Sequence, residues 1–274
     1  MISNLRHLLR HRRLIHALVL RDLKARYRGS VLGFFWSFVN PLLLLAVYTF
    51  VFSAVLPARF DGLDENYALF LFCGLLPWTW FASSLTDASN SLLVNGSLIQ
   101  KVLFPAEVLP VVAVVANMVH FFLALPVLLL ALVFFAQHVP SIASLLWIPL
   151  VIAVQFVMSI GFGLILAALT VHLRDIKDLL SNSLTLWFFA TPILYPWSMV
   201  ADRGPAIGGV RLGKILMDAN PFFHLAVSYQ ELLFFDGQYD HWKWLLLIAV
   251  ASIALFFVGY ALFDRLRDSF GEEV

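Results

Sequence analysis

The sequence predicts an all-α integral membrane protein with six transmembrane helices, and three observations carry this prediction. First, 66 consecutive residues between Glu107 and Arg174 contain no Asp, Glu, Lys or Arg. A helix crosses the hydrocarbon core with about 20 mostly apolar residues, so this run is long enough to cross twice. Second, 61% of the residues are hydrophobic and 13% are charged, whereas soluble chains contain about 25% charged residues. Third, four further apolar runs lie between charged residues elsewhere in the chain.

The charged residues divide the chain into its expected elements, all within a single transmembrane domain. In chain order these are a cytoplasmic amphipathic helix in residues 1–30, spans at 31–56 and 66–87, a short helix at 92–104, spans at 108–135, 144–170, 179–200 and 243–263, and a tail at 264–274. Between the last two spans, the uncharged stretch from Asp218 to Glu231 is too short to cross a bilayer. We therefore expect a re-entrant or interfacial hairpin there.

The distribution of Lys and Arg sets the expected orientation. Residues 1–28 hold eight of the 18 Lys and Arg. With both termini in the cytoplasm, 13 of the 18 lie on the cytoplasmic side, as the positive-inside rule favours. In residues 5–28 these charges mix with apolar residues, a pattern typical of an amphipathic helix on the membrane surface. The alternative is a basic segment that serves topology only.

Several apparent functional signals are weak. Gly208 to Ile215 resembles a phosphate-binding loop but has Ile where the Mg²⁺-binding hydroxyl would stand, so we expect no nucleotide site in this chain. His120 is interpreted as a packing residue rather than a proton relay. Ser159, Gly163 and Ala167 share one face of their helix and indicate close helix packing. The sequence offers no catalytic residues, no metal ligands and no sign of a nucleic-acid partner.

Aromatic residues follow helical spacing in two of the expected spans. Phe34, Phe38, Pro41, Leu45, Tyr48 and Phe52 share one face of the first span, and Leu184, Phe188, Thr191 and Tyr195 share one face of the fifth. One interpretation is a channel lining on which sugar rings stack, formed by Phe34, Phe38, Tyr48, Phe52, Phe188 and Tyr195. The other is that these rings contact lipid or pack against neighbouring helices.

Several blocks of the sequence resemble a known family. Residues 21–36 (RDLKARYRGSVLGFFW) with Asn40-Pro41, residues 76–81 (LPWTWF), and Asn95 with residues 98–110 (LIQKVLFPAEVLP) occur in the order found in ABC-2 type (type V) permeases that export polysaccharides. Arg174-Asp175, residues 191–195 (TPILY) and Asn220-Pro221 continue the similarity.

The resemblance implies an architecture and partners. Family members are homodimers of six-span subunits in the bacterial cytoplasmic (inner) membrane, and they work with two copies of an ATPase subunit that binds ATP and Mg²⁺. This chain is accordingly expected to hold no cofactor of its own. In the family an N-terminal helix lies at the interface, and short helices here placed at 203–230 form an extracytoplasmic gate. The helix at 92–104 would dock on the ATPase through Leu98, Ile99, Lys101, Val102 and Leu103.

The resemblance also implies a substrate class. The expected cargo is a polysaccharide linked to undecaprenyl diphosphate, with O-antigen first and teichoic acid or capsule as alternatives. Arg21, Lys24, Arg26 and Arg28 would bind the lipid diphosphate at the cytoplasmic entrance, or would only hold the helix on anionic lipid. A permease for a drug or small lipid is a further alternative. A membrane glycosyltransferase or acyltransferase is another, although the acidic metal motif or His base of such an enzyme is not visible.

Overall fold

A computed structural model describes residues 10–55, 66–100, 104–137, 139–202, 206–207, 210–235 and 239–273. These residues are almost entirely helical. The helices are α2 (Arg12–Arg26), α3 (Trp36–Phe50), α4 (Tyr67–Val94), α5 (Gly96–Ile99), α6 (Val108–Phe135), α7 (Ile142–His172), α8 (Ile176–Ala190), α9 (Trp197–Asp202), α10 (Leu212–Asp218), α11 (Pro221–Leu233), α12 (Trp242–Leu266) and α13 (Phe270–Glu273). Two-residue strands β1 (Ala206–Ile207) and β2 (Val210–Arg211) pair antiparallel before α10.

Within the described residues, four helices are long and apolar enough to cross a membrane: α4, α6, α7 and the α12 helix with its short extension to Ser269. Their bounds lie close to the expected second, third, fourth and sixth spans. The expected first span contains α3, which has 15 residues and is extended by a 3-10 turn (Gly33–Phe35) and a π-helical turn (Val51–Val55). A 15-residue α-helix is about 22 Å long, less than the roughly 30 Å hydrocarbon core.

The expected fifth span differs more. Instead of a continuous helix over 179–200, α8 covers Ile176–Ala190 and ends before Thr191-Pro192. The proline explains this end, because it lacks an N–H and disfavours helical backbone at the residue before it. Thr191 is accordingly extended, with ψ of 135°.

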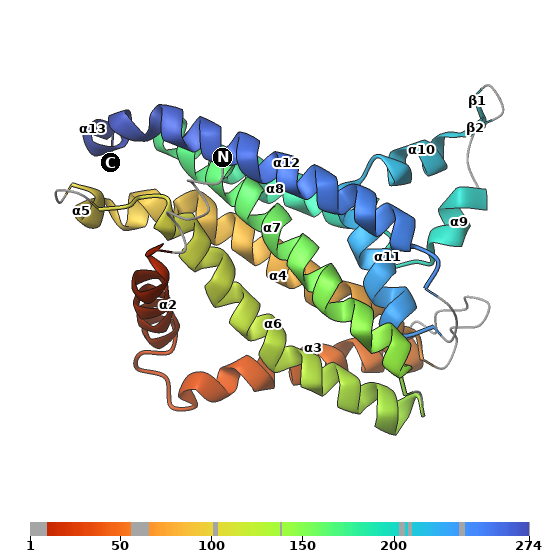
Figure 1. Cartoon of the computed structure of the whole chain (residues 1–274). Helices are drawn as coiled ribbons and strands as arrows, with labels where there is room; N and C mark the ends of the chain where they lie inside the picture. Colours follow the sequence, from red (N-terminus) through yellow and green to blue (C-terminus); the bar gives the residue numbers. More distant parts are fainter. Residues whose placement is uncertain are drawn as a thin grey trace.

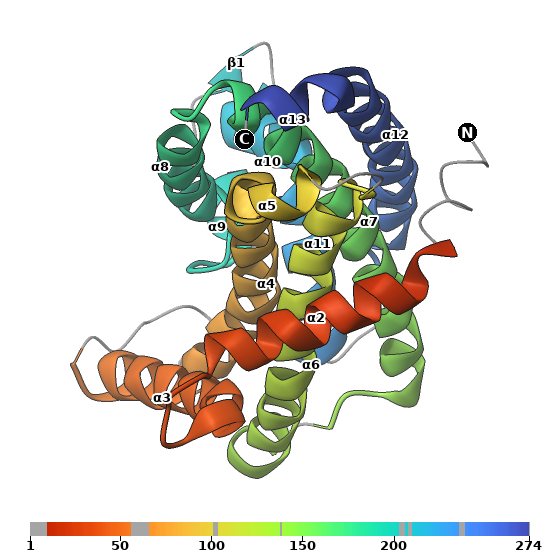
Figure 2. The same cartoon turned by 90° about the vertical axis from the view of Figure 1, so that its left-hand side faces the viewer.

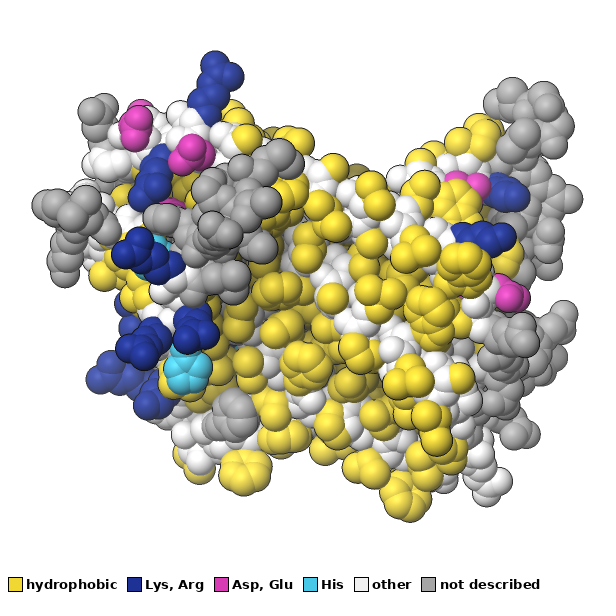
Figure 3. All heavy atoms as spheres, in the orientation of Figure 1, with side chains coloured by type: hydrophobic (Ala, Val, Ile, Leu, Met, Phe, Trp, Pro, Cys, Tyr) yellow, Lys and Arg dark blue, Asp and Glu magenta, His cyan; other side chains and the backbone are white. Residues whose placement is uncertain are grey.

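The long helices form a bundle with two polar ends (Figure 1). Helix α2 lies across the bundle axis at one end, near α5 and α13, which we name the α2 end. The opposite end carries α9, α10 and the β1–β2 pair, and we name it the α10 end. Figure 3 shows charged side chains at these two ends and hydrophobic side chains between them, as a membrane-spanning bundle requires.

Small residues allow α7 to pack closely on its neighbours. Ser159 and Ala167 are completely buried, and a Cβ atom placed on Gly163 would lie 3.1 Å from the Cβ of Ala88 on α4. This face of α7 therefore packs as its small residues predict. On the adjoining face, a Cβ atom on Gly259 of α12 would lie 2.5 Å from the carbonyl oxygen of Gly161. The backbones of α7 and α12 thus meet where neither helix carries a side chain.

Candidate functional site

A polar stripe follows the surface of α4. Its members are spaced by four, three and four residues and therefore share one helix face: Thr79, Ser83, Thr86 and Asn90. Thr79 and Thr86 are exposed, and Ser83 and Asn90 are half-buried. We name these four residues the α4 stripe. Thr79 and Thr86 donate to carbonyl oxygens of the preceding helical turn, and so does Asn90 through its Nδ2. Their side-chain oxygens keep the capacity to accept hydrogen bonds from a neighbouring group.

The α4 stripe lies between two flanking helices. Both α3 and α8 pack against α4, and Figure 2, which looks along the bundle, shows them on the same side of it. On the α3 side, Thr79 and Ser83 line a cavity of about 370 Å³ that also contains Asn40 and His120. On the α8 side, a cavity of about 380 Å³ is lined by Thr86 together with residues of α8, Ser181, Leu184, Thr185 and Phe188 among them.

His120 takes part in a hydrogen-bonded cluster inside the α3-side cavity. Its Nδ1 lies 3.2 Å from Ser37 Oγ, and Ser37 Oγ lies 2.8 Å from the Tyr27 hydroxyl. The three residues come from α6, α3 and the turn after α2. His120 thus joins three elements, as expected for a packing residue.

Two of the four predicted diphosphate-binding residues hold α2 on the bundle. Arg26 Nη2 lies 2.6 Å from Asp87 Oδ2 on α4, and its Nη1 donates to Asn117 Oδ1 on α6 at 3.1 Å. Arg21 Nη2 donates to Asn95 Oδ1 at 2.8 Å, at the joint between α4 and α5. Sequence reasoning missed these partners because they lie more than 60 residues away in the chain. All four residues are exposed, so what sets Arg21 and Arg26 apart is these hydrogen bonds.

The predicted aromatic face of α3 is turned toward the bundle. Leu45 is buried, and Phe38, Tyr48 and Phe52 are half-buried. The rings of Tyr48 and Phe52 stack with centroids 6.2 Å apart, and Phe52 meets Tyr67 of α4 edge-on at 4.6 Å. These rings therefore have a packing role within the chain, and their contact with substrate stays a prediction. The Phe34 side chain lies outside the described part of the structure.

The end of α8 is tied to the start of α11. Asn220 caps α11 by accepting from the backbone N–H groups of Phe222 and Phe223, and its Nδ2 donates to Thr191 Oγ1 at 3.0 Å. Trp187 Nε1 donates to Asn220 Oδ1 at 2.7 Å. The Thr191-Pro192 and Asn220-Pro221 motifs, separate in sequence, thus form one buried junction.

The two predicted lining residues of the fifth span are separated at this break. Phe188 remains on α8, with its ring centroid 5.7 Å from that of Trp78 on α4. Tyr195 lies beyond the helix, where its hydroxyl donates to the carbonyl oxygen of Phe189. The helical spacing that placed both residues on one face ends at Ala190. Their contact with substrate stays a prediction.

The predicted ATPase-docking helix is described in part. The structure shows α5 over Gly96–Ile99, while Lys101, Val102 and Leu103 lie outside the described residues. Leu98 is half-buried, and Ile99 packs against the buried core of the chain. Val94, at the end of α4, is an apolar side chain with 78% exposure, and sequence reasoning did not include it.

The α10 end contains a buried polar cluster around His241. Its Nε2 lies 3.0 Å from His224 Nδ1, and its backbone N–H donates to Glu231 Oε2 at 3.2 Å. His224 also stacks on Trp244. Burial, and secondarily the nearby His224, lowers the pKa of His241 to about 4. Burial raises the pKa of Glu231. The cluster fastens α11 to the start of α12.

Comparison with known proteins now decides the family. The family profile of ABC-2 type transporters matches residues 13–205, which is well over half of the chain. The chain belongs to the ABC-2 transporter family. It is therefore a multi-pass membrane permease, and membership implies that ATP is hydrolysed by a partner subunit.

Named relatives of this permease agree with the family. It is 37% identical to the O-antigen export system permease protein RfbA of Myxococcus xanthus over the full length of both chains. It is 33% identical to the protein of the same name from Klebsiella pneumoniae, over 92% of this chain and 91% of the relative. The polysialic acid transport protein KpsM of Escherichia coli is 22% identical over 91% of this chain and 92% of its own.

Proposed function

We propose that this permease exports an O-antigen polysaccharide, linked to undecaprenyl diphosphate, across the bacterial inner membrane. Two relatives that align with over nine-tenths of the chain carry the name of O-antigen export permeases. ATP hydrolysis by two copies of a separate ATPase subunit drives the movement. The chain itself contributes the path through the bilayer.

The functional assembly in this proposal is a homodimer of six-span subunits with both termini in the cytoplasm. The α3 region and α8 act as the first and fifth spans despite their length, and the surface that they flank on α4 faces the second subunit. Helices α9 to α11 form the extracytoplasmic gate. The Lys and Arg excess at the α2 end supports the assignment of that end to the cytoplasm.

The basic residues near α2 have two different roles in this arrangement. Arg21 and Arg26 position α2 through their hydrogen bonds to Asn95, Asp87 and Asn117. With Arg21 and Arg26 engaged in these contacts, Lys24 and Arg28 are the two that meet the diphosphate of the incoming lipid.

The α4 stripe is the observation that carries the proposal. A polymer of sugars presents many hydroxyl groups, and a path for it needs hydrogen-bonding partners in place of the water it leaves. Thr79, Ser83, Thr86 and Asn90 supply such partners along one helix face, and Trp78 and Phe188 border it. A path for an apolar drug would have no use for a polar stripe.

Obstruction of the stripe tests the proposal. Ser83→Trp and Thr86→Trp place a bulky ring on the proposed path, and each variant should stop delivery of O-antigen to the cell surface. The control is Val250→Trp on α12, because Val250 is 70% exposed and lies away from α4. Surface O-antigen is measured in cells that carry the variant with its ATPase and lack another exporter. Normal export by both stripe variants, at normal protein levels, would refute this path.

A further inference from the structure

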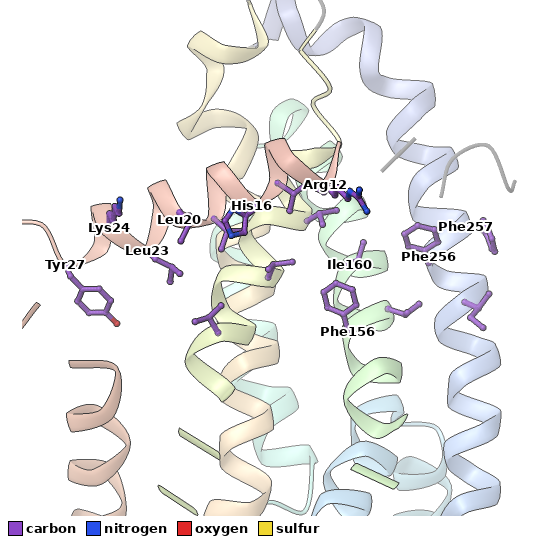
Figure 4. Close-up of a pocket in the computed structure, with 17 residues that line it drawn as sticks. Arg12, His16, Leu20, Leu23, Lys24, Tyr27, Phe156, Ile160, Phe256 and Phe257 are labelled. Atoms are coloured by element: carbon purple, nitrogen blue, oxygen red, sulfur yellow. The ribbon is translucent and has the colours of Figure 1, made fainter. Parts of the chain in front are cut away.

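A cavity of about 1140 Å³ lies beneath α2 and away from the α4 stripe. It is lined by 17 residues, which are Tyr27 in the turn after α2 and residues of α2, α6, α7 and α12 (Figure 4). Phe156 and Ile160 enter it from α7, and Phe256 and Phe257 from α12. None of its lining residues comes from α3, α4 or α8. Tyr27 also lines the α3-side cavity, and Lys24 is proposed above to meet the cargo diphosphate, so the cavity and the proposed polymer path share residues only near the end of α2.

Helix α2 presents two different rows to this cavity. Ile15, Val19, Leu23 and Tyr27 recur every four residues, are buried or half-buried, and form its apolar ceiling. Arg12, His16, Leu20 and Lys24 recur at the same spacing but are exposed, so they form its rim. The spacing places three groups that can carry positive charge beside an apolar interior.

The lining of the cavity carries basic side chains and no acidic ones. Among the 17 lining residues there is no Asp or Glu to balance Arg12, His16 and Lys24. The interior is formed by Val, Leu, Ile and Phe side chains, which offer no hydrogen-bonding groups to retain water. A matching occupant carries a negative headgroup and long hydrocarbon chains.

We propose that this cavity holds an anionic glycerophospholipid as a resident ligand. Its acyl chains lie between α6, α7 and α12, and its phosphate accepts hydrogen bonds from Arg12 and His16, which lie one helical turn apart on α2. Lys24 lies about 18 Å from Arg12 along the helix and is beyond the reach of the same phosphate. Charge-assisted bonds to phosphate are the strong class of hydrogen bond, and basic pockets between transmembrane helices are suited to anionic lipid headgroups. The lipid then fills the space between α2 and the helices α6, α7 and α12.

A second copy of this chain suits the cavity less well. Its own α2 carries the same basic row, so two such surfaces would bring like charges together. The proposal does not rest on the polymer that the permease exports, since the cavity has its own lining. A failed export test and a failed lipid test are therefore separate results.

Native mass spectrometry of the full chain, purified in mild detergent, tests the proposal. Phosphatidylglycerol and phosphatidylcholine of identical acyl chains are added in turn. We expect retained phosphatidylglycerol at about one per chain, and at least a tenfold weaker retention of phosphatidylcholine. The variant Arg12→Gln should lose this preference. The matched control, Arg13→Gln, removes the same charge from a neighbouring residue that does not line the cavity and should keep it.

Three results would overturn the proposal. The first is equal retention of the two lipids by the unaltered chain, and the second is equal loss in Arg12→Gln and Arg13→Gln; either would indicate only a general attraction of basic residues to anionic lipid. The third is a disulfide-linked dimer formed by Val157→Cys, which would place a second copy on the cavity. Filling the cavity with Val157→Trp supplies a further check, since this change leaves every rim charge in place and should still displace the lipid.

Discussion

Trp187 Nε1 and Asn220 Oδ1 lie 2.7 Å apart, and this hydrogen bond joins the last turn of α8 to the first turn of α11. The same Asn220 oxygen caps α11, and its amide group donates to Thr191. Asn220 is 9% exposed. One buried side chain thus fixes both the break in α8 and the start of the helix proposed as part of the gate.

Asn220→Ala should destabilise the permease by about 2–4 kcal/mol. The change removes a helix cap, worth about 1 kcal/mol, and takes away the acceptor of the half-buried Trp187 indole N–H, at about 1–3 kcal/mol. Thermal unfolding in detergent measures the effect. Asn182→Ala, at an exposed position of α8, serves as the control and should stay within about 0.5 kcal/mol. Equal stability of the two variants would show that the junction is not stabilising.

Gly259→Ala should weaken the contact between α7 and α12. The added Cβ atom would lie 2.5 Å from the Gly161 carbonyl oxygen, so the two backbones must move apart. Overpacking of this kind costs about 1–3 kcal/mol. Gly271→Ala makes the same chemical change where no atom lies within 4 Å of the new methyl group. Its unfolding temperature should match that of the unaltered chain, and a similar loss in both variants would contradict the close packing.

The stability of the α10 end should fall as the pH is lowered below about 6.5. The pKa of His241 is about 4 in the folded chain against an ordinary value of 6.5. Between these values the unfolded chain binds a proton that the folded chain does not, so acid favours unfolding, by up to about 3 kcal/mol. Glu231 offsets part of this loss, because its raised pKa makes the folded chain take up a proton sooner as the pH falls.

The His241 prediction is checked with unfolding temperatures between about pH 7.5 and pH 5. His241→Gln should show a flatter profile than the unaltered chain, and Glu231→Gln a steeper one. The charged neighbours Asp240 and Lys243 are unchanged in both variants. Parallel profiles of His241→Gln and the unaltered chain would rule out His241 as the group that titrates.

Val94→Asp should reduce association with the ATPase while leaving the permease folded. Val94 is 78% exposed at the α2 end, beside the short α5 helix, and apolar anchors at interface centres cost about 2 kcal/mol or more when lost. Co-purification of the two subunits measures the effect. Val139→Asp, at a 70% exposed valine just before α7, should have no effect on it. Retained association of Val94→Asp would place the docking contact elsewhere.

The sequence was informative where one-dimensional patterns determine structure. Charged residues bracket the apolar runs, so the expected span at 108–135 and helix α6 have the same bounds. The spacing of Ser159, Gly163 and Ala167 predicted close packing of α7, and the buried positions of these residues confirm it. Such features depend only on hydropathy and period.

Contacts between distant segments could not be predicted in this way. Arg26 pairs with Asp87, which lies 61 residues away in the chain. Sequence spacing gives no sign of that pairing, so the sequence indicated only a diphosphate as the partner of this charge. Helix α8 ends just before Thr191-Pro192. The helical spacing of residues up to Tyr195 predicted a helix that continues through this proline. The helical spacing of the α4 stripe can be read from the sequence. Only the structure shows that Thr79 and Thr86 are exposed, which distinguishes the stripe from polar residues that pack between helices.

The hydrogen bond between Arg21 and Asn95 connects α2 to the joint between two other helices. Asn95 is the single residue between α4 and α5. A tilt of α5 relative to α4 would change this bond and act on α2 through it. An ATPase docked at α5 and the lipid around α2 would therefore influence the same hydrogen bond.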